Sequence, residues 1–281
     1  MKVKRSVSFY IYQVFNTIVL TLMALSCILP ILHVFAMSLS SSSAAMAGRV
    51  GFVPVEFSLK AYEYLISKKD FFHSVSISLA RVLVGTVFNM AIIAITAYPL
   101  SRSSRQFRAR TAYMAYFAVT MFIGGGLIPT YMVIKNLHLL DSFWVLILPS
   151  AMSIWNVIIM MNFIKGLPRA IEEAAFVDGA NHWQTLIRVI LPMSKPSLAS
   201  LLLFSMIGHW NAWFDGMFYM NNPNNYPMAT YLATQVINNN QTMTNMTPEQ
   251  LALLSSLSEK TVRSAQMFIA IIPILVVYPF L

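Results

Sequence analysis

The chain has 281 residues, of which 57% are hydrophobic and only 10% are charged, and its formal net charge is +9. Soluble domains carry roughly 25% charged residues, so this chain is too poor in charge to cover a water-exposed surface, and lipid is its expected solvent. The single cysteine, Cys27, excludes an internal disulfide and a cysteine metal cluster. The composition therefore predicts a membrane protein built from helices.

Six segments of the chain are apolar and long enough to cross a bilayer, which takes about 20 residues per helix. The first segment follows a basic tip, but its apolar run is longer than the core of a signal peptide, so we expect a helix that is retained. A run of three glycines, 124–126, lies within the third segment, where it permits a kink or close helix contact. The six predicted spans are 11–37, 73–99, 110–134, 143–164, 197–220 and 262–281.

Basic residues gather in alternate loops between these spans. The cations on the opposite side are accompanied by acids, so the positive-inside rule places the basic loops and both termini in the cytoplasm. The Asn-rich segment 221–250 contains no Lys or Arg. It is typical of an extracytoplasmic loop with some local structure, the alternative being a disordered tether. The basic loop residues are Lys2, Lys4, Arg5, Arg102, Arg105, Arg108, Arg110, Lys165, Arg169, Arg188 and Lys195.

The sequence lacks the common catalytic and ligand-binding motifs. It contains no Gly-x-x-x-x-Gly-Lys-Ser/Thr loop for nucleotide phosphates and no His-Glu-x-x-His zinc motif. Its five histidines are scattered and show no metal-ligand spacing. A membrane enzyme would need a nucleophile with a base, or paired acids, at membrane depth, and Asp215 is the only acid placed near such a depth. We therefore expect no catalytic residues and no metal site in this chain.

Residues 172–192, EEAAFVDGANHWQTLIRVILP, form an unusually polar stretch between the fourth and fifth spans. Pro168 suits the first position of a helix, and Glu172 and Glu173 follow in or just after the first turn, where the helix dipole favours negative charge. Gly179 tolerates a left-handed backbone and ends this helix. Asn181 and, three residues later, Gln184 then predict the capping box of a second short helix.

Two such short helices are marginal in isolation, so something must hold them. They could lie on the membrane surface as an interfacial hairpin, or they could dock into a cytoplasmic partner. The small residues Ala174, Ala175 and Gly179 favour docking, because they permit close approach of a partner backbone, whereas an interfacial helix usually presents bulky anchors.

This stretch resembles the EAA motif of ABC importer permeases. The shared pattern is Glu173-Ala174-Ala175, then Gly179 after three residues, then Val189-x-Leu191-Pro192 after nine more. The family usually has Ile where this chain has Val189. The segments GGGLIPTYMVIKNLHLLDSFWVLILPS and GHWNAWFDGMFYM are similar to those of the maltose-type carbohydrate permeases, in the branch associated with oligosaccharide and polysaccharide uptake.

The resemblance implies the type I importer permease fold, with a cytoplasmic coupling helix seated in a cleft of an ATPase subunit. It implies an N-terminal transmembrane helix and extracytoplasmic loop over 1–72, and a five-helix permease core over 73–281 that contains the coupling loop 165–196. The chain would then be no enzyme and hold no cofactor, since ATP and Mg would be bound by partner subunits. The residues implied to couple to the ATPase are Glu172, Glu173, Ala174, Ala175, Asp178 and Gly179.

The resemblance also implies the partners. They are a second homologous permease subunit, two ATP-binding subunits and an extracytoplasmic solute-binding protein, all at the cytoplasmic (inner) membrane of a bacterium, with no role for nucleic acid. Transport would proceed by alternating access. The alternative is a secondary transporter or channel for small polar solutes that has no ATPase partner. That class usually shows inverted repeats or intramembrane acids for ion coupling, which this sequence does not show.

A sugar offers CH faces for stacking on aromatic rings and hydroxyls for hydrogen bonds. On a continuous fifth helix, Trp210, Trp213 and Met217 would share one face and Asn211 and Asp215 the adjacent face. The alternatives are an aromatic belt at the membrane interface for the tryptophans and helix-to-helix hydrogen bonding for the asparagines. A uronic-acid polymer such as alginate is one candidate cargo. The candidate substrate-pathway residues are Asn89, Asn156, His209, Trp210, Asn211, Trp213 and Asp215.

One basic residue, Arg81, falls inside the second predicted span. An unpaired charge in lipid costs several kcal/mol, so we expect this side chain to face protein or water.

Overall fold

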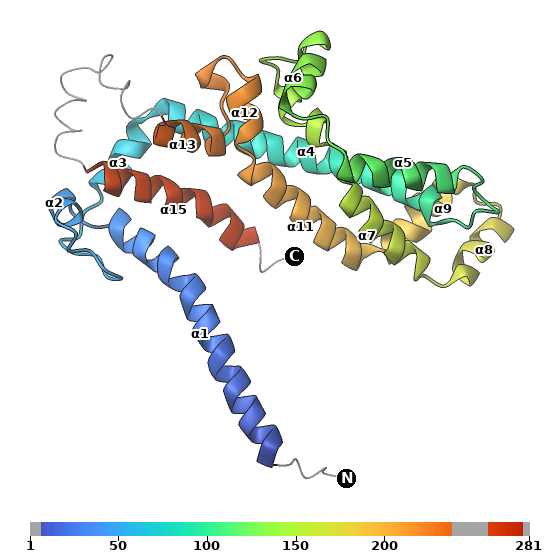
Figure 1. Cartoon of the computed structure of the whole chain (residues 1–281), viewed down its shortest axis with the longest axis horizontal. Helices are drawn as coiled ribbons and strands as arrows, with labels where there is room; N and C mark the ends of the chain where they lie inside the picture. The colour runs from blue at the N-terminus through green and yellow to red at the C-terminus, as the bar shows by residue number, and fades with distance from the viewer. Residues whose placement is uncertain (1–6, 238–257, 278–281) are drawn as a thin grey trace. The chain divides into compact units, whose positions relative to one another are not determined.

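The computed structural model describes residues 7–237 and 258–277, and the secondary structure in these two ranges is helical, with no strand. The all-helical prediction is therefore confirmed (Figure 1). The chain divides into two compact units. One consists of Met1–Lys69 with Asn238–Pro273, and the other of Asp70–Ile237 with Ile274–Leu281.

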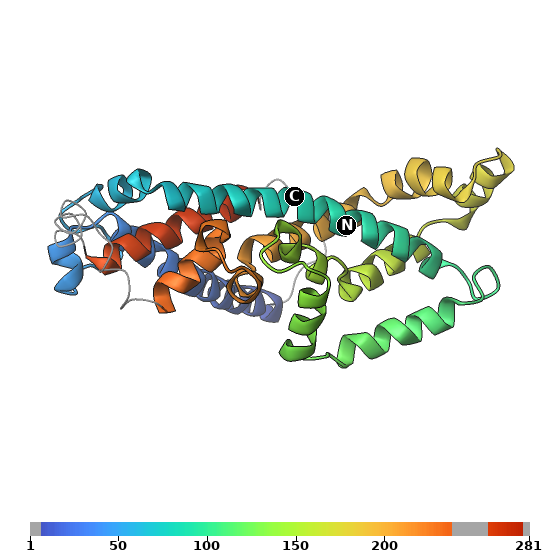
Figure 2. The same ribbon diagram turned by 90° about the horizontal axis from the view of Figure 1, so that it is seen from above.

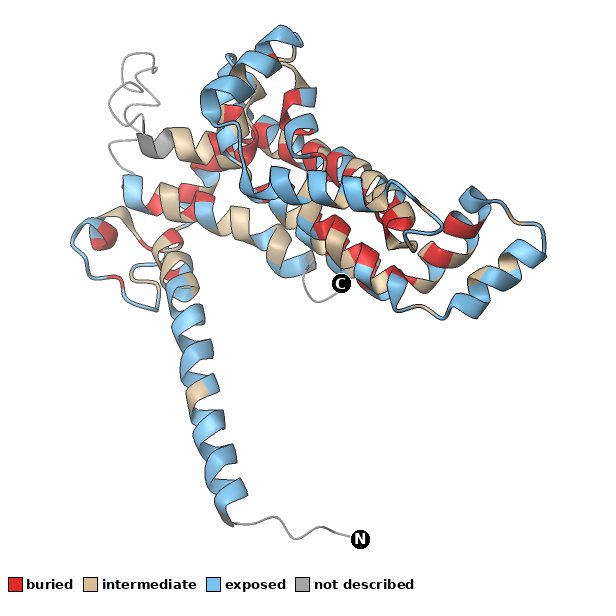
Figure 3. Cartoon of the chain, turned by 45° about the vertical axis from the view of Figure 1, so that its right-hand side comes forward, coloured by how far each residue is buried: buried red, intermediate tan, exposed pale blue. Residues whose placement is uncertain are grey.

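Within its described residues, the first unit contains the long apolar helix α1 and three shorter helices. Most of α1 is exposed along its length (Figure 3), as expected of a helix whose solvent is lipid. Only its last turns pack within the unit: the rings of Phe35 and Phe268 lie 4.6 Å apart, and the hydroxyls of Ser38 and Tyr62 lie 2.8 Å apart. The helices of this unit are α1 (Val7–Ser38), α2 (Ser42–Met46), α3 (Lys60–Ser67) and most of α15 (Glu259–Val277).

The second unit contains all but the first residue of α4 and every helix that follows, as far as α13. Short 3-10 turns lie at η1 (Phe143–Leu146), η2 (Leu148–Ser150) and η4 (Pro223–Asn225), and a π turn lies at η3 (Leu186–Ile190). The α-helices are α4 (Lys69–Ser101), α5 (Arg110–Phe122), α6 (Leu127–Asn136), α7 (Ile154–Lys165), α8 (Arg169–Val177), α9 (His182–Thr185), α10 (Leu191–Met193), α11 (Lys195–Asn211), α12 (Phe214–Tyr219) and α13 (Met228–Ile237).

The core of the second unit lies where α4 meets α7, η3 and α11. Ile93, Ala97, Met160, Leu186 and Leu201 are buried together there. These side chains come from helices far apart in the sequence, so apolar packing brings the polar loop between α7 and α11 beside the end of α4.

The helices match the predicted spans only in part. Ser8–Ser38 and Lys69–Ser101 are each long and apolar enough to cross a membrane, and three further helix pairs qualify only if each bent pair counts as one span. The sixth predicted span, 262–281, includes residues 278–281, which lie outside the described residues. The number six therefore stays a prediction.

Of the two roles open to the glycine run, a kink and close helix contact, the structure shows the kink. The helix breaks after α5, and α6 leaves at 116° (Figure 2, green). Gly126 precedes α6 with a φ of 81°, a conformation that glycine adopts without steric cost.

The prediction of one continuous helix over 197–220 is wrong. α11 ends at Asn211, Ala212 has an extended backbone, and α12 begins at Phe214. The shared faces predicted for Trp210, Trp213 and Met217, and for Asn211 and Asp215, do not exist across this break. Residues 221–237 contain the predicted local structure, η4 and α13, whereas residues 238–250 of that loop are not described.

Candidate functional site

The polar loop forms the two short helices that the sequence predicts. α8 spans nine residues with Glu172 in its first turn, and Pro168 is its N-cap, one position earlier than expected. Its C-terminus is a Schellman motif, in which the N–H of Ala180 donates to the carbonyl of Ala175 at 2.9 Å and that of Gly179 to Phe176 at 3.0 Å. The φ of Gly179 is 84°, as this turn requires.

The second helix begins with the predicted capping box. The Asn181 side chain accepts from the N–H of Gln184, and the Gln184 side chain accepts from the N–H of Asn181, both at 2.9 Å. The helix continues through a π turn to Met193 and then meets α11 at 85°. The coupling loop is thus connected by short helical segments to α11, the helix that carries most of the fifth predicted span.

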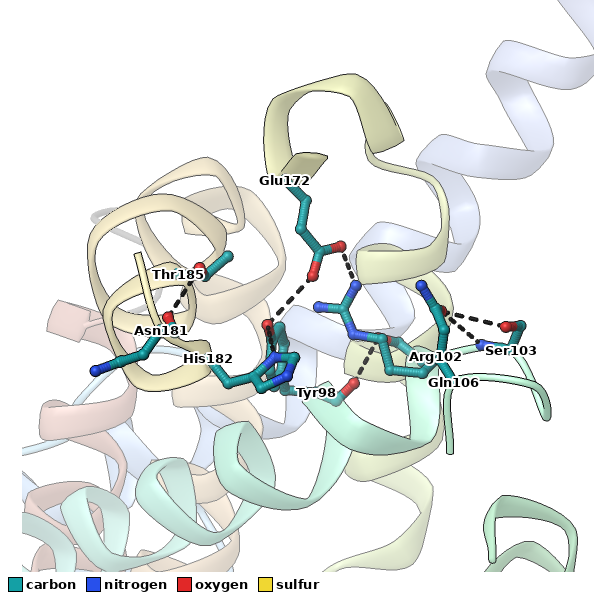
Figure 4. Close-up of polar contacts among 9 residues, drawn as sticks. Tyr98, Arg102, Ser103, Gln106, Glu172, Asn181, His182 and Thr185 are labelled. Atoms are coloured by element: carbon teal, nitrogen blue, oxygen red, sulfur yellow. Dashed lines mark hydrogen bonds and ion pairs between the residues drawn. The ribbon is translucent and has the colours of Figure 1, made fainter. Parts of the chain in front are cut away.

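The two adjacent glutamates of α8 have different surroundings, and Figure 4 shows those of Glu172. Glu172 forms an ion pair with Arg102 and accepts a hydrogen bond from the Tyr98 hydroxyl at 3.2 Å. The side chains of Arg102 and Glu172 are only 14% and 12% exposed. Glu173, one residue on, is exposed. Glu172 therefore binds within its own unit, and Glu173 is accessible to a partner.

The other residues of the predicted coupling set lie on the accessible part of this loop. Ala174, Asp178 and Gly179 are exposed, and Ala175 is half-buried. Small side chains on an exposed turn allow another backbone to approach closely. On its inner side α8 borders a cavity of about 360 Å³ between itself, the loop after α4 and the end of α7. Both glutamates of α8 line this cavity together with four basic side chains, Arg102, Arg110, Lys165 and Arg169.

The candidate substrate-pathway residues do not all lie together. Asn89 and His209 face each other across α4 and α11, and both are buried. With its amide nitrogen toward the available acceptors, Asn89 donates to the carbonyls of Gly85 and Ala151 at 3.1 Å and accepts from Nε2 of His209 at 3.2 Å. These two polar groups thus satisfy each other between helices, which is the alternative role considered for the asparagine.

Asp215 is held by the arginine of α4. Nη2 of Arg81 lies 2.5 Å from its carboxylate, and Nη1 of Arg81 donates to the carbonyl of Ala212 at 2.8 Å. The carbonyl of Trp213 accepts from the Thr230 hydroxyl at 2.8 Å. The two carbonyls at the break between α11 and α12 are therefore bound by side chains of α4 and α13. The expectation that Arg81 faces protein is confirmed.

The remaining candidate substrate-pathway residues differ in their exposure to solvent. Trp210 and Asn156 are buried, and the N–H of Asn156 donates to Ser153 at the start of α7. Asn211 and Trp213 are exposed at the break, with Trp213 43% exposed. Among the candidates near the break, these two offer an accessible amide and an accessible ring.

The sequence did not predict the side chains that form the contacts around α8, which are Tyr98, Arg102 and His182. For Arg81 a usable signal was present, because an arginine within a span needs an acid and Asp215 is the only acid in the fifth predicted span. For Tyr98 and Arg102 no local pattern exists, since Glu172 lies some 70 positions away in the chain.

A model of the family described as "Binding-protein-dependent transport system inner membrane component" matches residues 5–281. The polygalacturonan/rhamnogalacturonan transport system permease protein YtcP of Bacillus subtilis is 35% identical over 93% of this chain and 90% of its own length. Protein LplC of the same organism is 36% identical over 96% of this chain and 90% of its own length.

A solved structure has the same fold. It is the crystal structure of a bacterial ABC transporter involved in the import of the acidic polysaccharide alginate, with 32% identity, a TM-score of 0.88, and coverage of 99% of this chain and 97% of that one. The family match and the two relatives agree over nearly the whole chain. This chain belongs to the binding-protein-dependent inner-membrane permease components, a family of non-enzymatic transport subunits.

Proposed function

We propose that this chain is one of two transmembrane subunits of an ATP-driven importer that carries oligosaccharides of acidic polysaccharides by alternating access. The observation that carries the proposal is the exposed turn of α8, where the small residues Ala174 and Gly179 lie beside two acids, Glu173 and Asp178. Because a turn at Gly179 and the second short helix connect α8 to α11, a partner that moves this turn should also move a membrane span.

The proposed partners are a second permease subunit, two ATP-binding subunits that hold ATP and Mg, and an extracytoplasmic solute-binding protein. The family description supports the last of these, since it names binding-protein-dependent transport. The lack of a phosphate-binding loop in the sequence supports ATP hydrolysis by other chains. In this arrangement residues 73–281 form the permease core.

The cargo is proposed from the relatives and from the exposed groups at the helix break. One relative is named for polygalacturonan and rhamnogalacturonan transport, and the solved structure belongs to an alginate importer. Both kinds of polymer contain uronic acids. Trp213 supplies a ring on which the CH face of a sugar can stack, and Asn211 supplies an amide for its hydroxyls.

The proposed orientation places both termini and α8 in the cytoplasm. It is supported by the basic residues of the coupling loop and of the loop after α4, four of which line the cavity beside α8. A reporter fused after residue 178 should therefore be accessible only from the cytoplasmic side, and periplasmic access there would overturn the orientation.

Reconstitution tests the function directly. The full complex in proteoliposomes, with its binding protein, should take up oligogalacturonate or alginate oligosaccharide only when ATP is enclosed. Glu173→Gln should weaken association with the ATP-binding subunits and reduce uptake, while Arg105→Gln, an exposed arginine outside the coupling turn, should not. Uptake without any ATP-binding subunit would favour the alternative, a secondary transporter or channel.

A further inference from the structure

We propose that Tyr98, Arg102 and Glu172 form a clasp that transmits movement of α8 into α4, so that the two adjacent glutamates have separate roles. Glu172 would fasten α8 to its own subunit, and Glu173 would face the ATP-binding subunit. The inference rests on the proposed function, in which a partner moves α8.

The clasp holds a single carboxylate from two sides. Nη1 of Arg102 pairs with Oε2 of Glu172, and the Tyr98 hydroxyl donates to Oε1 at 3.2 Å. The guanidinium of Arg102 also lies over the Tyr98 ring, with Cζ 4.1 Å from the ring centroid. Both members of the ion pair are largely shielded from water. Such a pair is held more firmly than an exposed one, and loss of either member leaves an uncompensated charge.

α8 has few other attachments. None of its nine residues is buried. Its C-terminal turn depends on Gly179, which has no neighbour within 4 Å of the position a Cβ would occupy. Because apolar burial contributes little here, the side chain of Glu172 carries much of the hold on α8.

Tyr98 also joins the second short helix to the clasp. Its hydroxyl lies 3.4 Å from Nδ1 of His182, the first residue of α9. The His182 ring meets Phe176 of α8 edge-on at 5.0 Å. A displacement of α8 is therefore passed on through contacts at the end of α4 as well as through the chain into α11. This gives the transporter two connections between the coupling turn and its spans.

The separate roles proposed for Glu172 and Glu173 predict different defects when each residue is replaced. Without the clasp, the ATP-binding subunits still find Glu173 and the small-residue turn, but their movement is poorly transmitted to α4. ATP hydrolysis should then respond weakly to the loaded binding protein. Coupling between two sites typically changes a response by roughly 5- to 150-fold, so we expect this stimulation to fall by about tenfold.

A double-mutant cycle on the assembled transporter in nanodiscs tests the clasp. The variants are Glu172→Gln, Arg102→Gln and their combination, with Glu173→Gln and Arg105→Gln as matched controls. The readouts are copurification of the ATP-binding subunits and the ratio of ATP hydrolysis with and without binding protein loaded with alginate oligosaccharide or oligogalacturonate. Both clasp variants should copurify normally and lose stimulation, and the double variant should be no worse than either single one.

Three results would overturn the clasp: unchanged stimulation, losses that multiply in the double variant, or loss of copurification on Glu172→Gln. Arg102→Lys is a second variant in case Arg102→Gln does not assemble. It keeps the charge but not the planar group over Tyr98, and should retain part of the stimulation. If Glu173→Gln changes nothing, the proposed docking surface fails instead, while the Arg102–Glu172 cycle still decides the clasp.

Discussion

Arg81 binds both sides of the break between α11 and α12, through the carbonyl of Ala212 and the carboxylate of Asp215. Its side chain is fully buried, and that of Asp215 is 22% exposed. A broken helix at membrane depth leaves backbone carbonyls without partners, which is tolerated only where other groups bind them. A charged arginine within a span costs free energy, and so does a backbone carbonyl without a partner. The contacts that Arg81 makes at the break offset both costs. We infer that Asp215 serves this break rather than the cargo.

Removal of one member of this pair should destabilise the protein strongly. Asp215→Asn or Arg81→Met should each cost about 3–5 kcal/mol, the range for breaking a buried ion pair. Thermal unfolding of the purified complex in detergent measures the loss. The double variant should recover part of it, because no uncompensated charge remains, although the Ala212 carbonyl stays unbound. Full additivity of the two losses would show that Arg81 and Asp215 do not act as a pair.

Gly85 should not tolerate a side chain. A Cβ at this position would lie 2.5 Å from Nε2 of His209, so Gly85→Ala forces the ring out of its contact with Asn89. We expect a cost of about 1–3 kcal/mol, typical of overpacking. Gly208→Ala in the facing helix is the control, since nothing lies within 4 Å of that position. His209→Ala in combination with Gly85→Ala should relieve the clash, and thermal unfolding again reports the effect.

Substitutions of Gly179 distinguish two reasons for a glycine at this position: the backbone conformation of the turn and the space left for a partner. Its φ of 84° disfavours β-branched residues, so Gly179→Val should impair the turn at a cost of about 1–2 kcal/mol. Asparagine tolerates this conformation, so Gly179→Asn should preserve the fold of the loop. If uptake by the Asn variant is normal, the turn alone is required. If uptake is lost while the fold is preserved, a partner approaches Gly179 closely, as the proposed docking requires.

The loop after α1 should lose its order in acid. Hydrogen bonds from the Ser41 and Ser43 hydroxyls, aided by the charge of Arg49, lower the pKa of Glu56 from its ordinary value of 4.5. A lowered pKa in the folded state means that stability is complete above pH 4.5 and is lost as the pH falls through the folded-state value. The protection factors of the α2 amides in hydrogen exchange, which allow for the slower intrinsic exchange in acid, should therefore fall as the pH is lowered.

Glu56→Gln is the control for that measurement. Its α2 protection factors should already be lower at neutral pH and should show little further change in acid. A parallel acid response in the variant would assign the effect to another group.

Local sequence determined the elements whose causes lie within a few residues. Gly179 and the pair Asn181 and Gln184 specify a turn and a capping box by their own backbone preferences, and both formed as predicted. The glycine run likewise marked a place where a kink was one of two possible roles, and the break before α6 lies there. The EAA spacing identified the family, because about six fixed positions over twenty residues are a specific pattern.

Tertiary structure decided which polar groups meet. Glu172 and Glu173 are alike in sequence, yet only Glu172 reaches Arg102, because packing of α4 against α7 and α11 brings the end of α4 beside α8. The stretch 197–220 is apolar enough for one helix, but Arg81 and Thr230 bind the carbonyls of a break that no local signal marks. Helix periodicity reflects the secondary structure that a segment prefers in isolation. An ion pair between residues some 70 or 130 positions apart depends instead on how the helices pack.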